Sequence, residues 1–570
     1  MKSQNITDWV VQVFLKKNID RVFLYPGGTI APLVNSCISA GIKIENFKNE
    51  QGAGYAALAY SRISGTPQVV MVTSGPGVTN LMTVIADAYY DSTPLIVITG
   101  QIGTKDLKSR AGVRQRGFQE TPTVDITSPI SKSATLLDTV KKVGKYVPEA
   151  FISSMSGRKG PVILDFPMDV QRSQSKALPA TNIIFQQTPN LPNKIYSLSK
   201  IIHRIKKSKK IIILLGNGAH SLNKSNALNS VIKKLNALVV TSFLGVGTFN
   251  TKHKNFIGYI GHTGNYAANI AVSECDFLIV LGSRLDIRQT GTEVDEFVKN
   301  GKVLWVDIDK TELANPRIKA SFSINDDLKN FLNIFSKSLG DYQSKPDREW
   351  MKKIISIRNA RLDDVPTKNN KIQPRDFMDI LEEQTGNIDT IVATGVGCHQ
   401  HWAARHLSYK PKKKQHISSG GHGAMGFDLP SSIGASMLEP KKTTICIVGD
   451  GSFLMNIQEL ASLKERNLNL KIIVLNNARL GMVSQFQLIT FGDDPTTGDV
   501  EKINFSKIAN GFGISSAILH KKKDIVHKVK WLLAKQGPAL LEVSIDPLSD
   551  VVPMLLAGKQ MNDLWMNDGE

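Results

Sequence analysis

Short apolar runs alternate with helical patterns along the whole chain, and polar or turn-forming residues bound each run. Runs of this kind are typical of buried strands in parallel sheets, where helices cover both faces. The clearest runs span residues 69–72, 95–99, 162–166, 211–215, 277–281, 303–306, 445–448 and 472–475. The pattern therefore predicts an α/β protein built from doubly wound parallel sheets.

Two segments interrupt this alternation. Residues 172–193 are rich in Ser, Gln, Pro and Asn, and residues 340–372 are charged with one helical stretch. No short-period repeat is visible. We therefore expect three domains, over residues 1–180, 190–340 and 365–570.

Composition restricts the class of protein. The 570 residues are 41% hydrophobic and 21% charged, as in ordinary folded proteins. Trp9, Val10, Val13 and Phe14 recur at helical spacing within residues 1–17, which predicts an amphipathic surface helix rather than an export signal. No apolar run approaches the roughly 20 residues that span a bilayer. The four cysteines lie far apart, without metal-ligand spacing. We expect a cytoplasmic protein with no membrane partner.

The formal net charge is +20. The lysines form short scattered runs without interleaved aromatic residues, at 206–207, 209–210, 412–414 and 521–523. Solvated faces explain such runs more simply than nucleic-acid binding, so no nucleic-acid partner is expected. A positive field does raise the local concentration of anionic small molecules.

The strongest chemical signal lies in the third predicted domain. The apolar run 445–448 ends in Gly449-Asp450-Gly451-Ser452 and precedes a predicted helix over 455–466. A second run, 471–475, ends in Asn476-Asn477, and Asn477 follows Asp450 by 27 residues. That distance suits one strand–helix–strand unit. Both polar tips then emerge at the carboxyl edge of a parallel sheet, where ligands bind.

These tips suit a Mg²⁺ ion that bridges a diphosphate. Mg²⁺ takes about six hard oxygen ligands and shares them with phosphates. Asp450 offers a carboxylate and Asn477 a neutral amide oxygen. Gly449 and Gly451 let the backbone approach the phosphates, and the helix N-terminus favours the anion. An isolated Gly-Asp-Gly would be only a turn, but the Asn pair after a second strand favours the metal site.

Further runs of the chain carry a resemblance to a known family. They are YPGG at 25–28, EQGA at 50–53, TSGPGVTN at 73–80, FQETP at 118–122, GHGAMGFDLP at 421–430 and GMV at 481–483. With the two tips above, the chain resembles thiamine-diphosphate enzymes, most closely acetolactate synthase and its flavin-containing carboligase relatives. The resemblance implies a pyrimidine-binding, a central flavin-type and a diphosphate-binding domain, with a closing tail over residues 550–564 that excludes water.

The resemblance assigns the metal and diphosphate contacts. Asp450, Asn477 and the carbonyl of Arg479 would bind the metal. The residues expected to hold the diphosphate end are Val396, Gly397, Cys398, His399, Gly449, Gly451, Ser452 and Met482. Cys398 stands where the family usually has Gln. His399 is expected to donate a hydrogen bond rather than to act as a base.

The resemblance also assigns an activating carboxylate. Glu50 would drive the aminopyrimidine of the cofactor to its reactive form, because a carboxylate in an apolar pocket shares a proton with a weakly basic ring nitrogen. Taken alone, Glu50 would be a surface helix residue. The residues expected around the pyrimidine are Pro76, Asn80, Gly423, through its carbonyl, and Met425, which would hold the cofactor bent. The Glu50 and Asp450 halves of such sites come from different subunits, which implies a homodimer at least and possibly a tetramer.

Three residues are expected beside the reacting carbonyl. Phe118 and Gln119 match family residues there, and the Gly28 amide would hydrogen-bond an oxygen that gains charge. None of the 11 histidines is adjacent to another. Aldehyde-releasing relatives use such a pair, so its absence favours carbon–carbon bond formation.

Departures from the family surround the expected acceptor pocket. Phe486, near Val483, replaces a Trp, which enlarges the pocket and removes an N–H donor. Met168 replaces a usual Lys, and Arg114 and Arg116 stand where small or acidic residues are usual. A solvated loop would also explain the two arginines. Together the changes suggest a bulkier, anionic ketone acceptor, such as the nucleotide-linked 4-keto sugar that one relative uses.

The middle domain carries a run similar to the family's flavin-binding segment, RLDIRQTG at 284–291. The residues expected to bind FAD are Arg158, Arg284, Asp286, Arg288, Asp307 and Asp326, with 216–218 near the cofactor backbone. Residues 261–264 depart from the usual Gly-Met-His-Gly. We expect a structural FAD, since carboligation needs no net redox step. The alternative is a vestigial flavin domain that only packs the dimer.

Three functions remain open at this point. The leading one is a carboligase that decarboxylates pyruvate and transfers the two-carbon unit to a ketone, either a second 2-oxo acid or a keto sugar. An oxidase would instead pass the electrons to FAD. A non-catalytic relative is the third, and the presence of Glu50, Gln119, Asp450 and Asn477 argues against it.

Overall fold

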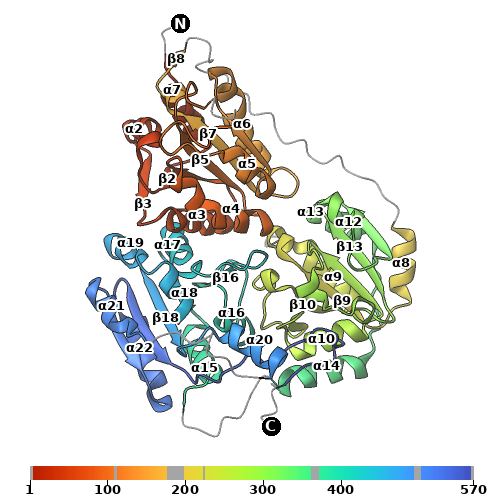
Figure 1. The fold of residues 1–570 in the computed structure, drawn as a ribbon. Coiled ribbons are helices and arrows are strands. Elements are labelled where there is room, and N and C mark those ends of the chain that lie inside the picture. The colour runs from red at the N-terminus through yellow and green to blue at the C-terminus, as the bar shows by residue number, and fades with distance from the viewer. Residues whose placement is uncertain are drawn as a thin grey trace.

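The protein is described here by a computed structural model, which covers residues 4–107, 112–175, 198–222, 225–360, 362, 371–492 and 502–566. It contains three six-stranded sheets, each parallel throughout and flanked by helices. Figure 1 shows the N-terminal domain in red and orange, the middle domain in yellow and green, and the C-terminal domain in cyan and blue. The predicted fold class is confirmed. Most of the segment at 172–193 lies outside the described residues.

The N-terminal sheet has the strand order β3-β2-β4-β5-β7-β6. Its strands are β2 (Arg21–Leu24), β3 (Lys43–Asn46), β4 (Gln68–Val72), β5 (Leu95–Gln101), β6 (Ser133–Leu136) and β7 (Pro161–Pro167). Its helices are α1 (Ile6–Lys16), α2 (Ala31–Ser39), α3 (Glu50–Ser64), α4 (Pro76–Tyr90), α5 (Thr123–Thr127), α6 (Val140–Met155) and α7 (Met168–Gln171). The short strands β1 (Gln4–Asn5) and β8 (Gln174–Ser175) pair antiparallel. The predicted N-terminal helix is therefore present as α1.

The middle sheet has the order β11-β10-β9-β12-β13-β14. Its strands are β9 (Ile211–Leu215), β10 (Leu238–Thr241), β11 (Phe256–Tyr259), β12 (Phe277–Leu281), β13 (Lys302–Asp307) and β14 (Phe322–Asn325). Its helices are α8 (Ser199–Lys206), α9 (Asn226–Leu235), α10 (Tyr266–Glu274), α11 (Ile287–Thr290), α12 (Lys310–Ala314), α13 (Leu328–Ser338) and α14 (Arg348–Ala360). Trp350 and Ile354 of α14 join this domain's core, so that helix belongs with the middle sheet.

The C-terminal sheet has the order β16-β15-β17-β18-β20-β19. Its strands are β15 (Thr390–Thr394), β16 (Lys414–Ser418), β17 (Thr443–Gly449), β18 (Leu470–Asn476), β19 (Ser515–Leu519) and β20 (Ala539–Ser544). Its helices are α15 (Pro374–Thr385), α16 (Cys398–His406), α17 (Asp428–Leu438), α18 (Asp450–Met455), α19 (Glu459–Arg466), α20 (Gly481–Phe491), α21 (Phe505–Gly511) and α22 (Ile525–Ala534).

One sequence expectation about this domain is wrong. A single helix was predicted over 455–466, but the structure has two, α18 and α19. The chain leaves the helical conformation at Asn456, whose side-chain amide donates to Gln51 Oε1 and to the Gly426 carbonyl, both at 2.8 Å. A side chain that reaches two other segments in this way requires a break that helical periodicity does not reveal.

Alternate residues of the central strands enter two different hydrophobic clusters, one on each face of the sheet. In β4, Val69 and Met71 pack with α1, α2 and α6, whereas Val70 and Val72 pack with α3 and α4. Burial on both faces explains why these strands appear in the sequence as continuous apolar runs. None of the helices in the described ranges is long and apolar enough to cross a bilayer.

The N- and C-terminal domains share one hydrophobic core. Residues of β4 and β5 belong to the same cluster as alternate residues of β17 and β18, and α3 packs directly on α17 between them. The approach is close, because a Cβ on Gly434 of α17 would lie 2.0 Å from the Ala56 carbonyl oxygen. Figure 1 shows α3 and α17 side by side where the two domains meet.

Candidate active site

The carboxyl ends of β17 and β18 lie side by side, because the two strands pair in parallel with Gly449 opposite Leu475. Asp450 begins α18 and Asn477 follows β18, and both side chains are buried. The Asn477 amide lies 2.9 Å from the Arg479 carbonyl oxygen and 3.3 Å from Asp450 Oδ2. Ala478, between Asn477 and Arg479, has a left-handed φ of 55°, and this turn brings the Arg479 carbonyl back to the Asn477 side chain.

This donor set fits a hard divalent cation. The Asn477 amide can adopt two orientations. With its nitrogen toward Asp450, it donates to Asp450 Oδ2 and to the Arg479 carbonyl oxygen. With its oxygen on that side, the oxygens of Asp450, Asn477 and Arg479 converge as three acceptors, as Mg²⁺ requires. Burial raises the pKa of Asp450, and backbone N–H donors, Gly451 first, oppose that rise. The described residues contain no group of three His, Cys, Asp or Glu side chains that would hold a metal unaided. A cation here would need further oxygens from a ligand, such as phosphates.

The glycines and His399 shape the space beside this edge. Gly397 has a φ of 147°, and His399 is buried in the first turn of α16. A Cβ on Gly397 would lie 2.9 Å from His399 Nδ1, and one on Gly449 3.1 Å from it. Cys398 is also buried, and burial raises the pKa of its thiol, so it stays neutral. The structure thus brings these four predicted residues together.

The loop 419–426 runs from β16 to α17 and carries Gly423 and Met425. The Met425 methyl group is 3.4 Å from where a Cβ on Gly451 would lie, so Met425 adjoins the metal edge. Within the loop, Ala424 N donates to Ser419 Oγ at 3.0 Å, and Gly426 N donates to Ser452 Oγ at 2.9 Å. These bonds hold the Gly423–Met425 stretch against α18.

Glu50 is the first residue of α3, and its carboxylate is buried. Asn49 caps the helix by accepting from Gln51 N at 2.8 Å, which fixes the direction of Glu50. Asn80 Nδ2, one turn into α4 after Pro76, donates to Glu50 Oε2 at 3.0 Å. Two of the predicted pyrimidine residues, Glu50 and Asn80, are therefore in contact. Among the described residues of one chain, no hydrogen bond or ion pair joins Glu50 to the Asp450 edge.

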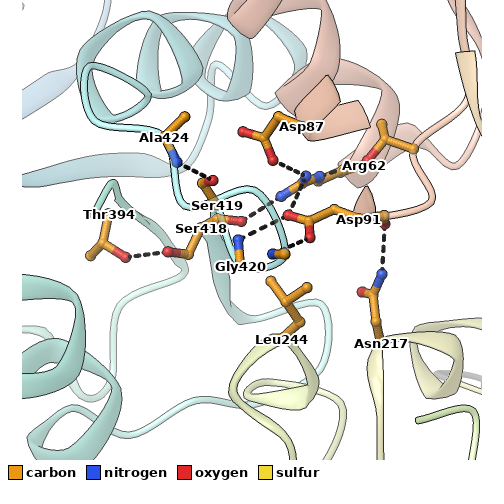
Figure 2. Close-up of polar contacts among 12 residues, drawn as sticks. Arg62, Asp87, Asp91, Asn217, Leu244, Thr394, Ser418, Ser419, Gly420 and Ala424 are labelled. Atoms are coloured by element: carbon orange, nitrogen blue, oxygen red, sulfur yellow. Dashed lines mark hydrogen bonds and ion pairs between the residues drawn. The ribbon is translucent and has the colours of Figure 1, made fainter. Parts of the chain in front are cut away.

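Figure 2 shows a polar junction that ties this loop to all three domains. Asp91, just after α4, accepts from Gly420 N at 3.0 Å and Gly421 N at 2.7 Å, and pairs with Arg62 Nη2 at 2.9 Å. Asn217 of the middle domain donates to the Asp91 carbonyl at 2.9 Å. Sequence reasoning missed this junction, in which the bonded partners Asp91 and Gly421 lie 330 positions apart.

The residues predicted for the substrate pocket are mostly exposed. Phe118 is 86% and Phe486 64% exposed, and Val483, Arg114 and Arg116 are also exposed. Gln119 has a left-handed φ of 63° and lies against Gly75, whose added Cβ would be 2.8 Å from the Gln119 Cβ. Gly28 begins a short 3-10 helix and Met168 begins α7. The described elements of one chain do not cover the side chains of Phe118, Val483 and Phe486.

A cavity of about 550 Å³ lies between the three domains. Five of the predicted flavin residues line it: Arg158, Arg284, Asp286, Arg288 and Asp307. Asp326 is fully buried and accepts from Asn330 Nδ2 at 2.7 Å, and its neighbour Asp327 lines the cavity instead. Burial raises the pKa of Asp307 to about 6.

Glycines let the cavity wall form. Gly216 and Gly218 pack on Gly282, which has a φ of 63°, and a Cβ on Gly216 would lie 2.1 Å from the Gly282 carbonyl oxygen. No larger side chain fits this approach. An extended ligand with a polar end would therefore meet backbone groups here, as nucleotide cofactors do.

Four histidines that the sequence did not single out as ligands also line the cavity: His220, His262, His401 and His416. Burial lowers the pKa of His262 to about 4 and of His416 to about 3, and it lowers the pKa of the other two as well. All four are therefore neutral near pH 7. Residues 261–264, which differ from the family's usual Gly-Met-His-Gly, also reach this cavity: Thr263 Oγ1 lies 2.9 Å from His401 Nδ1.

The C-terminal tail crosses from the C-terminal to the middle domain. Arg405 of α16 donates to the carbonyls of Val552, at 2.5 Å, and Thr263, at 2.9 and 2.7 Å. Leu555 N donates to the His262 carbonyl at 2.7 Å. The predicted closing segment thus packs beside both the cavity and α16.

Comparisons with known proteins agree with this architecture. Models of thiamine pyrophosphate (thiamine diphosphate) enzymes match the chain in three parts. The N-terminal TPP binding domain matches residues 4–127, the central domain residues 198–334, and the C-terminal TPP binding domain residues 395–543.

Full-length relatives narrow the family further. The acetolactate synthase isozyme 2 large subunit of Escherichia coli (strain K12) is 32% identical, over 98% of this chain and 99% of its own length. The acetolactate synthase large subunit of Lactococcus lactis is 34% identical, over 97% and 95%. The chloroplastic acetolactate synthase of Arabidopsis thaliana is 34% identical, over 98% and 84%. The chain therefore belongs to the thiamine pyrophosphate enzymes, and it is an enzyme of the acetolactate synthase type.

Proposed function

We propose that this enzyme binds thiamine diphosphate through Mg²⁺, decarboxylates pyruvate and transfers the two-carbon unit to a ketone acceptor. One observation carries the proposal. The oxygens of Asp450, Asn477 and Arg479 converge at one sheet edge, beside a loop whose Met425 adjoins Gly451. The names of the full-length relatives, all acetolactate synthases, support the reaction type.

The chain's own residues have distinct tasks in this scheme. Thiamine diphosphate, when bound, supplies the electron sink for the carbanion left by decarboxylation. Asp450, Asn477 and the Arg479 carbonyl hold Mg²⁺, and His399 donates to the diphosphate. Asn80 donates to Oε2 of Glu50, which leaves Oε1 to hold the proton shared with the pyrimidine nitrogen. Burial of Glu50 strengthens that shared hydrogen bond.

The site is proposed to assemble from two copies of the chain. Among the described residues of one chain, Asn80 is the one side chain that hydrogen-bonds to the Glu50 carboxylate, and the side chains of Phe118, Val483 and Phe486 are exposed. A homodimer at least, or a tetramer, would bring the Glu50 edge of one subunit to the Asp450 edge of another.

We also propose that FAD occupies the 550 Å³ cavity. Its arginines and carboxylates suit a dinucleotide, and the neutral histidines suit an uncharged ring. Since carboligation needs no net redox step, the flavin would be structural. Release of a yellow chromophore on denaturation, with absorbance near that of free FAD, is the direct check.

The acceptor has two candidates: a second 2-oxo acid, as in acetolactate formation, or a nucleotide-linked 4-keto sugar. A specific observation favours the sugar. Among the described residues, the exposed side chains of Arg114 and Arg116 form no ion pair, and the Phe486 side chain is 64% exposed. Free guanidinium groups suit a ligand that carries phosphates.

One assay separates these possibilities. The purified protein is incubated with thiamine diphosphate, Mg²⁺, FAD and pyruvate, with and without a nucleotide-linked 4-keto sugar, and the products are identified by mass spectrometry. Acetolactate from pyruvate alone identifies the 2-oxo acid as acceptor. Slow pyruvate use, with one acetyl unit gained by the sugar, identifies the sugar. Peroxide or acetate from pyruvate alone would instead establish an oxidase, and no pyruvate consumption at all would refute the proposal.

A further inference from the structure

Asp428 is a fully buried carboxylate beneath the predicted diphosphate site, and the reaction scheme above gives it no role. It is the first residue of α17 and follows Phe427 in the loop that carries Gly423 and Met425. A buried carboxylate is costly unless it is hydrogen-bonded and its charge is offset. Its partners therefore show what it does.

Three segments converge on Asp428. The Gly395 amide donates to Oδ1, and His399 Nε2 lies 3.0 Å from the same oxygen. The Ser452 hydroxyl donates to Oδ2. Gly395 follows β15, His399 lies in the first turn of α16, and Ser452 lies in the first turn of α18. One carboxylate thus links the starts of three helices around the site.

The second oxygen also controls the loop. Ser452 donates its hydroxyl proton to Asp428 and accepts from Gly426 N at 2.9 Å through the same oxygen. Asp428 therefore supports the Met425 stretch indirectly, through Ser452. Among the described residues, His399 is the one basic side chain that lies within 4 Å of the Asp428 carboxylate, at 3.0 Å.

The pairing fixes which way the His399 ring faces. Because Nε2 is held by Asp428, Nδ1 points in the opposite direction, to where added Cβ atoms on Gly397 and Gly449 would lie 2.9 and 3.1 Å from it. Gly449 immediately precedes Asp450. Nδ1 is therefore aimed into the glycine-lined space beside the metal edge, where the diphosphate is proposed to lie.

We infer that Asp428 is a positioning residue that holds His399 as a hydrogen-bond donor to the diphosphate of thiamine diphosphate. The inference rests on the proposed function. The carboxylate oxygen beside Nε2 orients the ring, so that Nδ1 faces the space proposed for the diphosphate. The arrangement corresponds to the carboxylates behind metal-ligating histidines, which orient the ring and whose loss weakens binding by about 10–100-fold.

The test is a double-mutant cycle on thiamine diphosphate affinity, measured by calorimetry with saturating Mg²⁺ on the full chain. Asp428→Asn keeps the size of the side chain and an acceptor for Gly395 N but removes the charge. Asp428→Asn should raise the Kd by about 10–100-fold. When thiamine diphosphate saturates the Asp428→Asn variant, its turnover should be within about threefold of that of the unsubstituted enzyme, because only cofactor binding is weakened. Asp428→Ser, also neutral, is a second variant in case the first does not fold.

The cycle is completed by His399→Asn and the double variant. If Asp428 acts through His399, the double variant binds no more weakly than His399→Asn alone. The matched control is Glu382→Gln. Glu382 pairs with Lys414 at 2.5 Å in the same domain, at the start of β16 and so at the opposite edge of the sheet. This variant should leave the Kd unchanged.

Two results would overturn the inference. One is an unchanged Kd in both Asp428 variants. The other is a double variant whose fold-change in Kd equals the product of the fold-changes in Asp428→Asn and His399→Asn. A loss of affinity in Glu382→Gln as large as in Asp428→Asn would reduce the role of Asp428 to general stability and would also count against it. Failure of the unsubstituted protein to bind thiamine diphosphate would refute the proposed function itself, and the inference with it.

Discussion

The junction of Arg62, Asp87 and Asp91 yields a quantitative prediction (Figure 2). Asp91 and Asp87 are both buried, and the Arg62 guanidinium lies 2.9 Å from Asp91 Oδ2 and 3.6 Å from Asp87 Oδ1. Burial raises the pKa of Asp87 well above its ordinary value, and the negative charge of Asp91 adds to the rise. The protonated form of Asp87 is therefore favoured, and the Asp91 carboxylate is the nearer of the two to the Arg62 guanidinium.

The perturbation is Asp91→Asn. The amide retains one acceptor oxygen for the two backbone donors, Gly420 N and Gly421 N, so one donor is left poorly satisfied, at about 1–3 kcal/mol. Loss of the charge would also leave Arg62 unpaired, which costs about 3–5 kcal/mol for a buried pair. The Asp91 charge contributes to the raised pKa of Asp87, however, so its removal favours ionisation of Asp87, which lies 3.6 Å from the Arg62 guanidinium. The single variant should therefore lose only about 1–3 kcal/mol.

The double variant Asp87→Asn/Asp91→Asn has no replacement carboxylate at this position. It should lose about 3–5 kcal/mol beyond the single Asp91 variant, whereas Asp87→Asn alone should be nearly neutral. The assay is urea unfolding of the four proteins at neutral pH, followed by tryptophan fluorescence. If the two single effects add to the double within about 0.5 kcal/mol, the compensation by Asp87 does not occur and the reasoning is refuted.

The pH dependence of the same pair follows from the direction of the shift. Because the folded-state pKa of Asp87 lies above its ordinary value of 3.8, its contribution to stability is full below that value and is lost as the pH rises through the folded-state pKa. Asn cannot ionise. Asp87→Asn should therefore gain stability relative to the unsubstituted protein as the pH rises. If the unfolding free energy of the variant falls relative to that of the unsubstituted protein over this range, the assignment is wrong.

Three further predictions concern other residues. Glu50→Gln keeps an acceptor for Asn80, so thiamine diphosphate binding should persist while pyruvate turnover falls by about 10²–10⁴; near-normal turnover would exclude the proton-sharing role. Asp450→Ala removes the carboxylate of the proposed metal set and should abolish Mg²⁺-dependent cofactor binding; calorimetry that shows unchanged affinity would disprove the metal assignment. Burial raises the pKa of Glu459 to about 7, so its stabilising contribution is present at lower pH and is lost as the pH rises through about 7. The thermal midpoint of the protein should therefore fall more than that of Glu459→Gln between about pH 6 and pH 8, and equal falls would contradict this.

Periodicity was sufficient for the strands because it depends on burial alone. Each of the eight apolar runs is a strand, since a strand covered on both faces has no polar side to interrupt it. The local order of strand, Gly-Asp-Gly and second strand also placed Asp450 and Asn477 at the same edge. The break at Asn456 was missed because its cause, a side chain bonded to Gln51 and Gly426, is not local.

Asp428, Arg62 and Asp91 were beyond sequence reasoning for the same reason. Asp428 stands within the run at 421–430, yet nothing in the run shows that it lies beneath His399 and Ser452. A carboxylate at the start of a helix is usually explained by the helix dipole, and that explanation would have sufficed. Only its complete burial shows otherwise.

The sequence by itself determined the α/β class, the three sheets and the polar residues at the strand ends, because these depend on residues near one another along the chain. The tertiary structure alone decided which distant groups meet. The packing of α3 on α17 joins the N- and C-terminal domains, and the junction of Arg62, Asp91 and Asn217 ties the middle domain to them. Such contacts result from many weak packing terms summed over whole interfaces, and no short pattern of residues encodes that sum.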